Sequence, residues 1–273
     1  MSWLLLLPAL YLLLALALYL YQDRLLYPGG RERPPLESYE YIEGSQRLSE
    51  VSLLHSGNVE LVHWFAPPRD PAKPIVVSFH GNAGHTGDRL EKLVWLLEQG
   101  YGLFMVEYRG YGGMPGRASE AVFRDDALTV LDWLEEQGYP AGRLVTYGES
   151  LGTGLATWVA AQFPVQAVVL EAPYDSILSL GMRRYGFFPV KWLLRDHWRS
   201  DVWAADVTAP VLILHGSRDR IIPIEHSRHL FEAFAGPKQM EVFEEGQHID
   251  LYDHGAEAVA TKFLNTHLKA FAG

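Results

Sequence analysis

The sequence Gly-Glu-Ser-Leu-Gly at residues 148–152 follows an apolar run at 144–147 and precedes a segment rich in glycine and alanine. A serine on a sharp turn from a strand into a helix is exposed at the sheet edge, and small neighbours let the backbone approach closely. The context therefore predicts a nucleophile elbow with Ser150 at its apex. Taken alone the pattern is weak, because Ser150 would serve equally well as the N-cap of an ordinary helix.

Two polar motifs downstream strengthen this prediction. His-Gly-Ser-Arg-Asp at 215–219 and Gly-Gln-His at 246–248 each follow a short apolar run. Open α/β sheets place their sites at the carboxyl ends of strands, and serine, aspartate, histidine is a known chain order for a catalytic triad. A serine hydroxyl needs a base to take its proton, and the base needs a carboxylate that holds its tautomer. We predict a triad of Ser150 as nucleophile, His248 as general base and Asp219 as orienting acid.

Other polar residues compete for these roles. Asp175 follows the apolar run that ends at residue 170, where some proteins of this architecture carry their acid, but the motif around Asp219 favours the latter. Asp250 is expected to cap the next helix. His226 and His229 could share a helix face as metal ligands, yet no third ligand is near in sequence. We expect both histidines to be surface residues and predict no metal site.

A third loop suggests how an oxyanion would be stabilised. His-Gly-Asn-Ala-Gly at 80–84 follows a buried-type strand and opens a helix. This is where such sites take one backbone donor, the other being the residue after the nucleophile. We therefore predict the backbone N–H groups of Asn82 and Leu151 as donors, with a contribution from the Asn82 side chain left open. His80 precedes the turn and is expected to be a structural hydrogen-bonding residue.

Short apolar runs alternate with helical patterns along most of the chain. The runs lie at 75–79, 103–108, 144–147, 167–170, 211–214 and 240–243. Strands buried on both faces have this composition because helices cover each side of a parallel sheet. We predict an α/β fold whose mostly parallel central sheet has helices on both faces. Two antiparallel strands precede it near 49–55 and 59–66, and a short helical cap is inserted at about 175–207.

The N-terminal part contains nineteen uncharged residues at 3–21, eleven of them leucine. As a helix this run is about 28 Å long, close to the thickness of a bilayer core. It has no preceding Lys or Arg, is longer than a normal signal-peptide core and ends in tyrosine and leucine. These features favour an uncleaved transmembrane helix over a cleaved signal.

The predicted organisation is an anchor at 1–22, a tether at 23–48 and one globular domain at 49–273. Pro-Gly-Gly and Pro-Pro sequences in the tether suggest that the domain is independent of the anchor, which is expected to contribute nothing to the triad. Arg24, Arg31 and Arg33 follow the anchor, so the positive-inside rule favours a single-pass protein with its domain on the cytoplasmic face.

Composition excludes several classes of function. The formal net charge of −10 comes from 33 acidic and 23 basic residues, and it would repel nucleic acid. The chain has no cysteine, which excludes disulfides, a thiolate nucleophile and a cysteine-based zinc site. Covalent catalysis would have to use another nucleophile, and Ser150 is the one in a suitable context.

The motifs together resemble those of α/β-hydrolase-domain proteins that carry one N-terminal membrane anchor, a group that includes eukaryotic protein depalmitoylases and bacterial relatives. The resemblance covers nearly the whole chain. The matching stretches are Arg-Leu-Leu-Tyr-Pro at 24–28, His-Gly-Asn-Ala-Gly at 80–84, Tyr-Arg-Gly-Tyr-Gly at 108–112 with Gly116, Ser-Leu-Gly-Thr-Gly at 150–154, Glu-Ala-Pro-Tyr at 171–174, and the loops of Asp219 and His248.

The resemblance implies the α/β-hydrolase fold and the same triad, Ser150, Asp219 and His248. One departure limits what it implies about substrate. Depalmitoylases of this group are themselves lipidated on an N-terminal cysteine cluster, which this chain lacks, and an apolar helix stands in its place. Depalmitoylase activity is therefore not carried over.

The expected function is hydrolysis of esters or thioesters through an acyl-enzyme, with no metal or organic cofactor. The same groups can cleave amides, so a peptidase or amidase remains an alternative. A non-catalytic scaffold is a third, because a fold does not confer activity. The cap insert is rich in aromatic and cationic residues. The aromatics could form the core of a small helical subdomain, or some of them could line an acyl pocket over Ser150. The second alternative, with the cations near a bilayer, favours membrane-borne acyl substrates.

Overall fold

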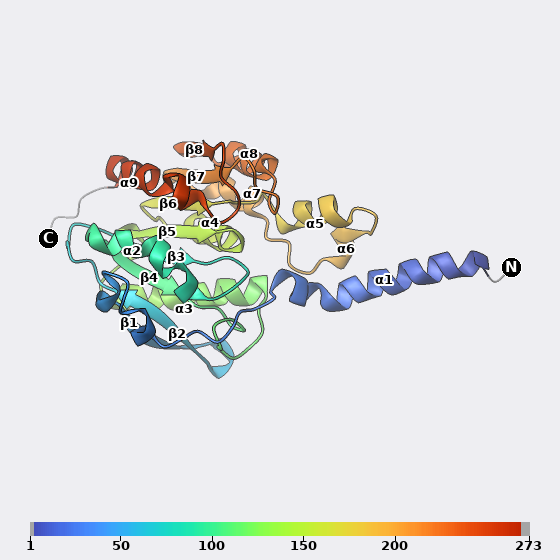
Figure 1. The fold of residues 1–273 in the computed structure, drawn as a ribbon, viewed down its shortest axis with the longest axis horizontal. Helices are drawn as coiled ribbons and strands as arrows, with labels where there is room; N and C mark the ends of the chain where they lie inside the picture. The colour runs from blue at the N-terminus through green and yellow to red at the C-terminus, as the bar shows by residue number, and fades with distance from the viewer. Residues whose placement is uncertain (1–2, 269–273) are drawn as a thin grey trace.

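The computed structural model describes residues 3–268, and an eight-stranded sheet runs through the globular part (Figure 1). Its spatial order is β1-β2-β4-β3-β5-β6-β7-β8. The strands are β1 (Ser49–His55), β2 (Val59–Ala66), β3 (Ile75–Phe79), β4 (Gly102–Val106), β5 (Leu144–Glu149), β6 (Ala167–Glu171), β7 (Val211–Gly216) and β8 (Lys238–Phe243). Strands β1, β2 and β4 pair antiparallel, and all the other pairs are parallel.

Helices cover both faces of this sheet. The helices are α2 (Leu90–Glu98), α3 (Glu120–Glu136), α4 (Leu151–Gln162), α8 (Ile224–Ala233) and α9 (Ala256–His267). Alternate side chains of a strand point to opposite faces, so Val77 packs with α3 and α4 while Val76 packs with α2 and α9. The central strands are buried along their length, which explains their nearly continuous apolar sequence. The predicted mostly parallel sheet with helices on both faces is confirmed.

The predicted cap lies between β6 and β7. It consists of α5 (Ile177–Tyr185), α6 (Val190–Leu193) and α7 (Ser200–Trp203). Ser176 begins α5 as an N-cap, because its side chain accepts a hydrogen bond from the Ser179 N–H. The cap aromatics divide into two sets. Trp198 is fully buried in the main core, whereas Phe187 and Trp192 are 82% and 81% exposed.

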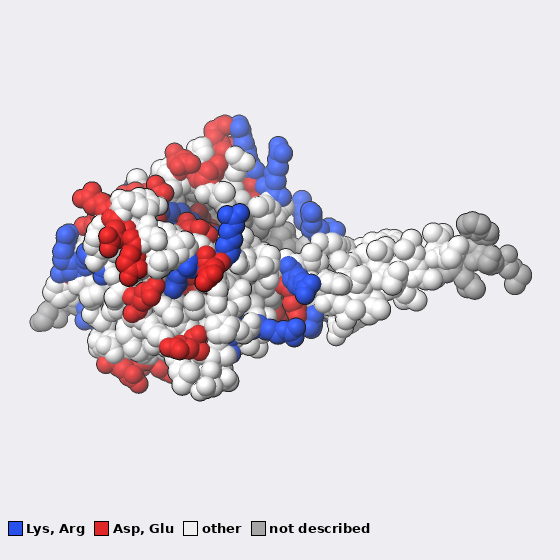
Figure 2. Space-filling view, turned by 60° about the horizontal axis from the view of Figure 1, so that its bottom comes forward, with Lys and Arg blue, Asp and Glu red and all other residues white. Residues whose placement is uncertain are grey.

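A long helix, α1 (Trp3–Leu26), projects from the globular part (Figure 1). Its segment Leu6–Leu26 is long and apolar enough to cross a membrane, and the projecting part carries almost no charged side chains (Figure 2). The helix extends four residues beyond the anchor end expected at residue 22. The segment 22–26 contains no helix breaker, and Pro28 follows two residues after the helix ends.

The segment expected to be a tether packs against the domain. Tyr27, Arg33, Ile42 and Leu48 are buried, and Arg33 donates hydrogen bonds to the Val62 carbonyl and to a buried carboxylate. Proline- and glycine-rich composition correctly indicates irregular backbone here, but composition does not show whether such a segment is free or packed. Contacts with residues distant in sequence decide that.

Candidate active site

Ser150 occupies the turn between β5 and α4, with φ 49° and ψ −115°. Such a positive φ costs a non-glycine residue about 1–3 kcal/mol and is kept only where surrounding structure requires it. The two flanking glycines make the turn possible. A side-chain carbon at Gly152 would lie 2.1 Å from the Phe79 carbonyl oxygen, and one at Gly148 would lie 2.6 Å from that of Gly152. The 148–152 motif is therefore a strained elbow, not an ordinary helix start.

The structure brings the three predicted triad residues together. His248 Nε2 lies 3.0 Å from Ser150 Oγ, and His248 Nδ1 lies 2.7 Å from Asp219 Oδ2. Asp219 and His248 sit in the loops that follow the neighbouring strands β7 and β8, at the same sheet edge where Ser150 follows β5. These distances allow a proton to pass from the serine to the imidazole while a carboxylate holds the opposite nitrogen.

The environment of Asp219 favours its charged form. Burial alone would raise the pKa of this carboxyl, but hydrogen bonds from His248 and from the backbone N–H groups of Ile221 and Ile222 outweigh burial and lower the pKa. The two backbone bonds measure 2.8 and 2.9 Å. They also fix the carboxylate so that its other oxygen faces His248.

The competing residues have other partners. Asp175 accepts a 2.7 Å hydrogen bond from His226 Nδ1 and another from the Ser176 N–H. Asp250 accepts from the Gln247 N–H at 2.6 Å and makes no capping bond to the helical turn that follows it, contrary to expectation. The interaction of His248 with a carboxylate is thus made by Asp219.

His226 corrects one expectation. It is 6% exposed and not a surface residue, because the Asp175 carboxylate at the root of the cap binds its ring. His229, by contrast, has a side chain that is 74% exposed. Within residues 3–268, no group of three histidine or acidic side chains is arranged to hold a metal ion.

The predicted oxyanion donors, Asn82 and Leu151, line the same pocket as Ser150. Leu151 begins α4, so its N–H belongs to the first turn of a helix, whose amides have no partner within the helix. The Asn82 side chain, which might have been a donor too, instead donates a 3.2 Å hydrogen bond to the Leu26 carbonyl at the end of α1. The backbone N–H of Asn82 remains the predicted donor.

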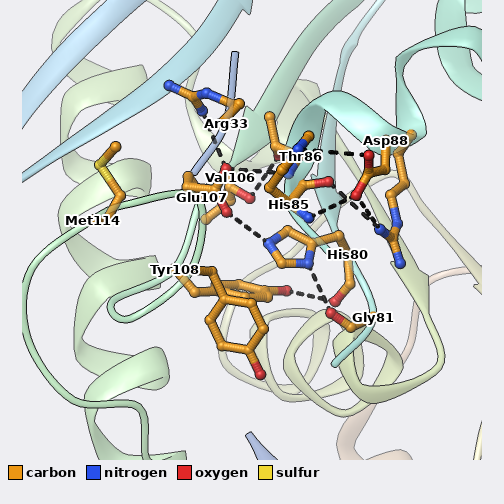
Figure 3. Close-up of polar contacts among 12 residues, drawn as sticks. Arg33, His80, Gly81, His85, Thr86, Asp88, Val106, Glu107, Tyr108 and Met114 are labelled. Carbon is orange, nitrogen blue, oxygen red and sulfur yellow. Dashed lines mark hydrogen bonds and ion pairs between the residues drawn. The ribbon is translucent and has the colours of Figure 1, made fainter. Parts of the chain in front are cut away.

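Behind this turn lies a buried polar network that the sequence analysis missed (Figure 3). Glu107 is fully buried and contacts His80 Nε2 at 3.1 Å, Arg33 Nη1 at 3.2 Å and the Thr86 N–H at 3.1 Å. Burial would raise the pKa of Glu107, but the bonds from His80 and the charge of Arg33 lower it. His80 is thus a structural hydrogen-bonding residue, as expected. In the sequence, the signal that could have indicated this network is a lone glutamate within the apolar run at 103–108.

A second network lies directly behind the nucleophile. Arg89 and Lys92 both bind Glu149, the residue before Ser150, and Lys92 also contacts Glu171 at 2.8 Å. Burial would raise the pKa of Glu149 and lower that of Lys92, but their mutual attraction reverses both effects. The elbow therefore packs against a largely buried network of two cations and two carboxylates.

Replacing Lys92 with Met should lower the free energy of unfolding by about 3–5 kcal/mol, because the change leaves two buried carboxylates without their shared cation. The midpoint of chemical denaturation measures this loss. Arg218→Gln is the matched control, since it breaks an ion pair whose side chains are 60% and 61% exposed and should cost less than about 1 kcal/mol. Equal small effects of the two substitutions would show that the buried network contributes little.

The pocket at Ser150 has a volume of about 710 Å³. Its walls come from the cap, from the loop after Asp219 and from α1, and most of the lining side chains are apolar. A site of this size and character accommodates a flexible apolar group next to a polar reacting bond.

Comparison with known proteins identifies the family. Residues 74–196 match the family described as the alpha/beta hydrolase fold. The uncharacterized protein YfhR of Salmonella typhimurium is 31% identical over 230 residues, which cover 76% of this chain and 78% of that protein. The chain belongs to the α/β-hydrolase family. An uncharacterized protein of Mycobacterium tuberculosis is 38% identical over 181 residues, 66% of this α/β-hydrolase. The chain spans only 64% of that relative's length.

Two further similarities concern proteins with named activities. The lysophosphatidylserine lipase ABHD12 of Danio rerio is 28% identical over 197 residues, covering 65% of this α/β-hydrolase and 51% of the lipase. The esterase Pf2001 of Pyrococcus furiosus has a solved structure that superposes with a TM-score of 0.64 at 16% identity, covering 81% of this chain and 92% of that one. At this identity the esterase shows the shared fold alone.

Proposed function

We propose that this α/β-hydrolase is a serine hydrolase that cleaves carboxylic ester or thioester bonds of acyl substrates at a membrane. The observation that carries this proposal is the continuous hydrogen-bonded line from Ser150 Oγ through His248 to Asp219, at a strained elbow that opens into an apolar pocket. The similarity to a lipase supports ester substrates.

The geometry suggests a two-step reaction. Ser150 Oγ attacks the carbonyl carbon while His248 Nε2 takes the serine proton, and Asp219 stabilises the imidazolium that forms. The backbone N–H groups of Asn82 and Leu151 would hold the negative oxygen of the tetrahedral intermediate. His248 then gives its proton to the departing alcohol or thiol, leaving an acyl-enzyme. Water, activated by the same histidine, releases the acid.

A fluorophosphonate probe followed by a substrate series tests this function. Esters, thioesters and amides of one acyl group should be compared at equal enzyme concentration. Faster turnover of the esters and thioesters than of the amides is the expected result. The reverse order would identify a peptidase or amidase, and an unlabelled, inactive protein would favour a non-catalytic role.

Charge at the base of α1 supports action at a membrane. Lys and Arg side chains gather where this helix meets the globular part (Figure 2). Arg195 of the cap pairs with Asp23 at 3.0 Å, and Arg183 and Arg184 line the pocket. Cations in this position suit anionic headgroups, and the positive-inside rule favours a domain on the cytoplasmic face.

Acyl chain length should affect the rate strongly. We expect kcat/KM for esters of about eight or more carbons to exceed that for the acetyl ester by at least about 10-fold, since each buried methylene contributes up to ~0.8 kcal/mol. A series of esters with one common leaving group measures this preference. Highest efficiency on acetyl, with no gain from added methylenes, would mean that the pocket does not hold the chain.

A further inference from the structure

Helix α1 forms one wall of the pocket that contains Ser150. Five of its residues line that pocket, namely Leu18, Tyr19, Gln22, Leu25 and Leu26. The facing wall is the cap, which contributes apolar side chains such as Ile177, Leu180 and Leu193. The outer part of the pocket is thus built from a helix that is long and apolar enough to cross a bilayer.

One face of α1 is partly covered from Tyr11 to Leu26, whereas residues 6–10 are exposed. The half-buried residues of the helix recur at spacings of three and four and include Tyr11, Ala15, Leu18, Gln22 and Leu26. Residues at this spacing share one side of a helix. Leu18, Gln22 and Leu26 line the pocket from this partly covered face. Tyr19 and Leu25 also line the pocket but are 40% and 55% exposed.

Polar contacts hold α1 and the cap at a fixed relative position. Gln22 donates to the Leu193 carbonyl at 3.0 Å and accepts from the Arg195 N–H at 2.8 Å. Tyr11 donates to the Phe187 carbonyl at 3.1 Å. Polar side chains next to hydrocarbon are costly unless they are bonded, and here the cap backbone supplies the partners. The two walls are therefore held together as one unit.

The inner end of α1 contacts the oxyanion turn. Asn82 binds the Leu26 carbonyl through its side chain, and Gly29 forms a parallel bridge with Ala83. The wall of the pocket thus continues without a break from the projecting helix to the residues beside Ser150.

The depth of these contacts relates the pocket to the bilayer. Tyr11 lies fifteen residues before Leu26, about 22 Å along the helix axis. If α1 crosses a membrane, the contact between Tyr11 and Phe187 turns the outer end of the cap towards the bilayer. The exposed rings of Phe187 and Trp192, both in the cap, suit lipid better than water.

We infer that α1 is part of the substrate site, and that the acyl chain of a membrane-borne ester or thioester enters from the lipid between α1 and the cap. This inference rests on the proposed function and names the route and the binding wall for its substrate. The chain slides along the apolar face of α1 until its ester carbonyl reaches Ser150, while the polar headgroup stays at the membrane surface.

A double substitution, Leu18→Trp with Leu25→Trp, tests this inference because the larger side chains on α1 would fill the space between α1 and the cap. The full chain is placed in phosphatidylcholine vesicles, and labelling of Ser150 is timed with a hexadecyl and an ethyl fluorophosphonate. The ratio of the long-chain to the short-chain rate should fall at least about 10-fold, which corresponds to roughly two lost buried methylenes. Labelling by the ethyl probe shows that the site remains folded.

Leu20→Trp is the matched control, because Leu20 is exposed, does not line the pocket and lies on the opposite side of the helix from Leu18. It should keep the wild-type ratio. An unchanged ratio in the double variant, or an equal fall in the control, would overturn the lateral route. Failure of both probes to label the wild-type protein at Ser150 would instead remove the proposed function and this inference with it.

Discussion

Ser150→Ala is expected to abolish labelling by fluorophosphonates and to lower kcat by about 10⁴ to 10⁶, the range for loss of a triad nucleophile. The reason is chemical. Ser150 Oγ is the atom within 3.0 Å of His248 Nε2, and alanine offers nothing to acylate. Residual turnover would come from the oxyanion donors and from substrate binding alone. Steady-state rates on a medium-chain ester and gel detection of the labelled protein measure the two effects.

Ser52→Ala is a suitable control, because this exposed serine lies on the edge strand β1 and is not part of the site. It should leave labelling and kcat at wild-type values. Labelling of the Ser150→Ala protein at the wild-type rate would show that another residue is the nucleophile.

Asp219→Asn should lower kcat by at least about 10³, because an amide cannot hold the His248 tautomer or stabilise the imidazolium as a carboxylate does. The lowered pKa of Asp219 means that the wild-type carboxyl is charged in neutral solution. The substitution therefore removes a full negative charge from beside His248. The 2.7 Å contact to His248 Nδ1 is the one that changes. Steady-state kinetics and the rate of fluorophosphonate labelling report the loss.

The comparison with Asp175→Asn makes this test specific. Asp175 contacts His226 and the first turn of the cap, so its substitution should change kcat only slightly. Thermal unfolding of both variants separates a catalytic loss from a loss of stability. If Asp175→Asn were the more damaging change in kcat at equal stability, the orienting acid would be Asp175.

Much of the proposed site could be predicted because its signals are local. Ser150, Asp219 and His248 each follow an apolar run directly, and parallel strands bring their carboxyl ends to one edge of the sheet. Two glycines mark the elbow because no larger residue fits beside Ser150. These signals determined the sheet, the cap position and the three residues that the structure brings together.

The partners of buried polar residues could not be predicted in this way. Glu107 looks like an interruption of an apolar run, and its bonds to Arg33 and His80 join three separate segments. His226 looks like a surface residue until Asp175 is seen beside it. Whether a charged side chain is buried depends on which segments pack together in the folded protein. The periodicity of apolar residues along the chain does not show which segments these are.

The N-terminal helix shows most clearly which features follow from the sequence alone and which depend on tertiary structure. The sequence by itself determined that residues 3–21 form an apolar helix, since composition and length suffice for that. It also suggested an independent domain on a tether. Only the tertiary structure decided that α1 packs against the cap and lines the pocket, because Tyr11 and Phe187 are 176 residues apart in the chain. Contacts over such separations arise from the packing of complete elements, and no local pattern encodes them.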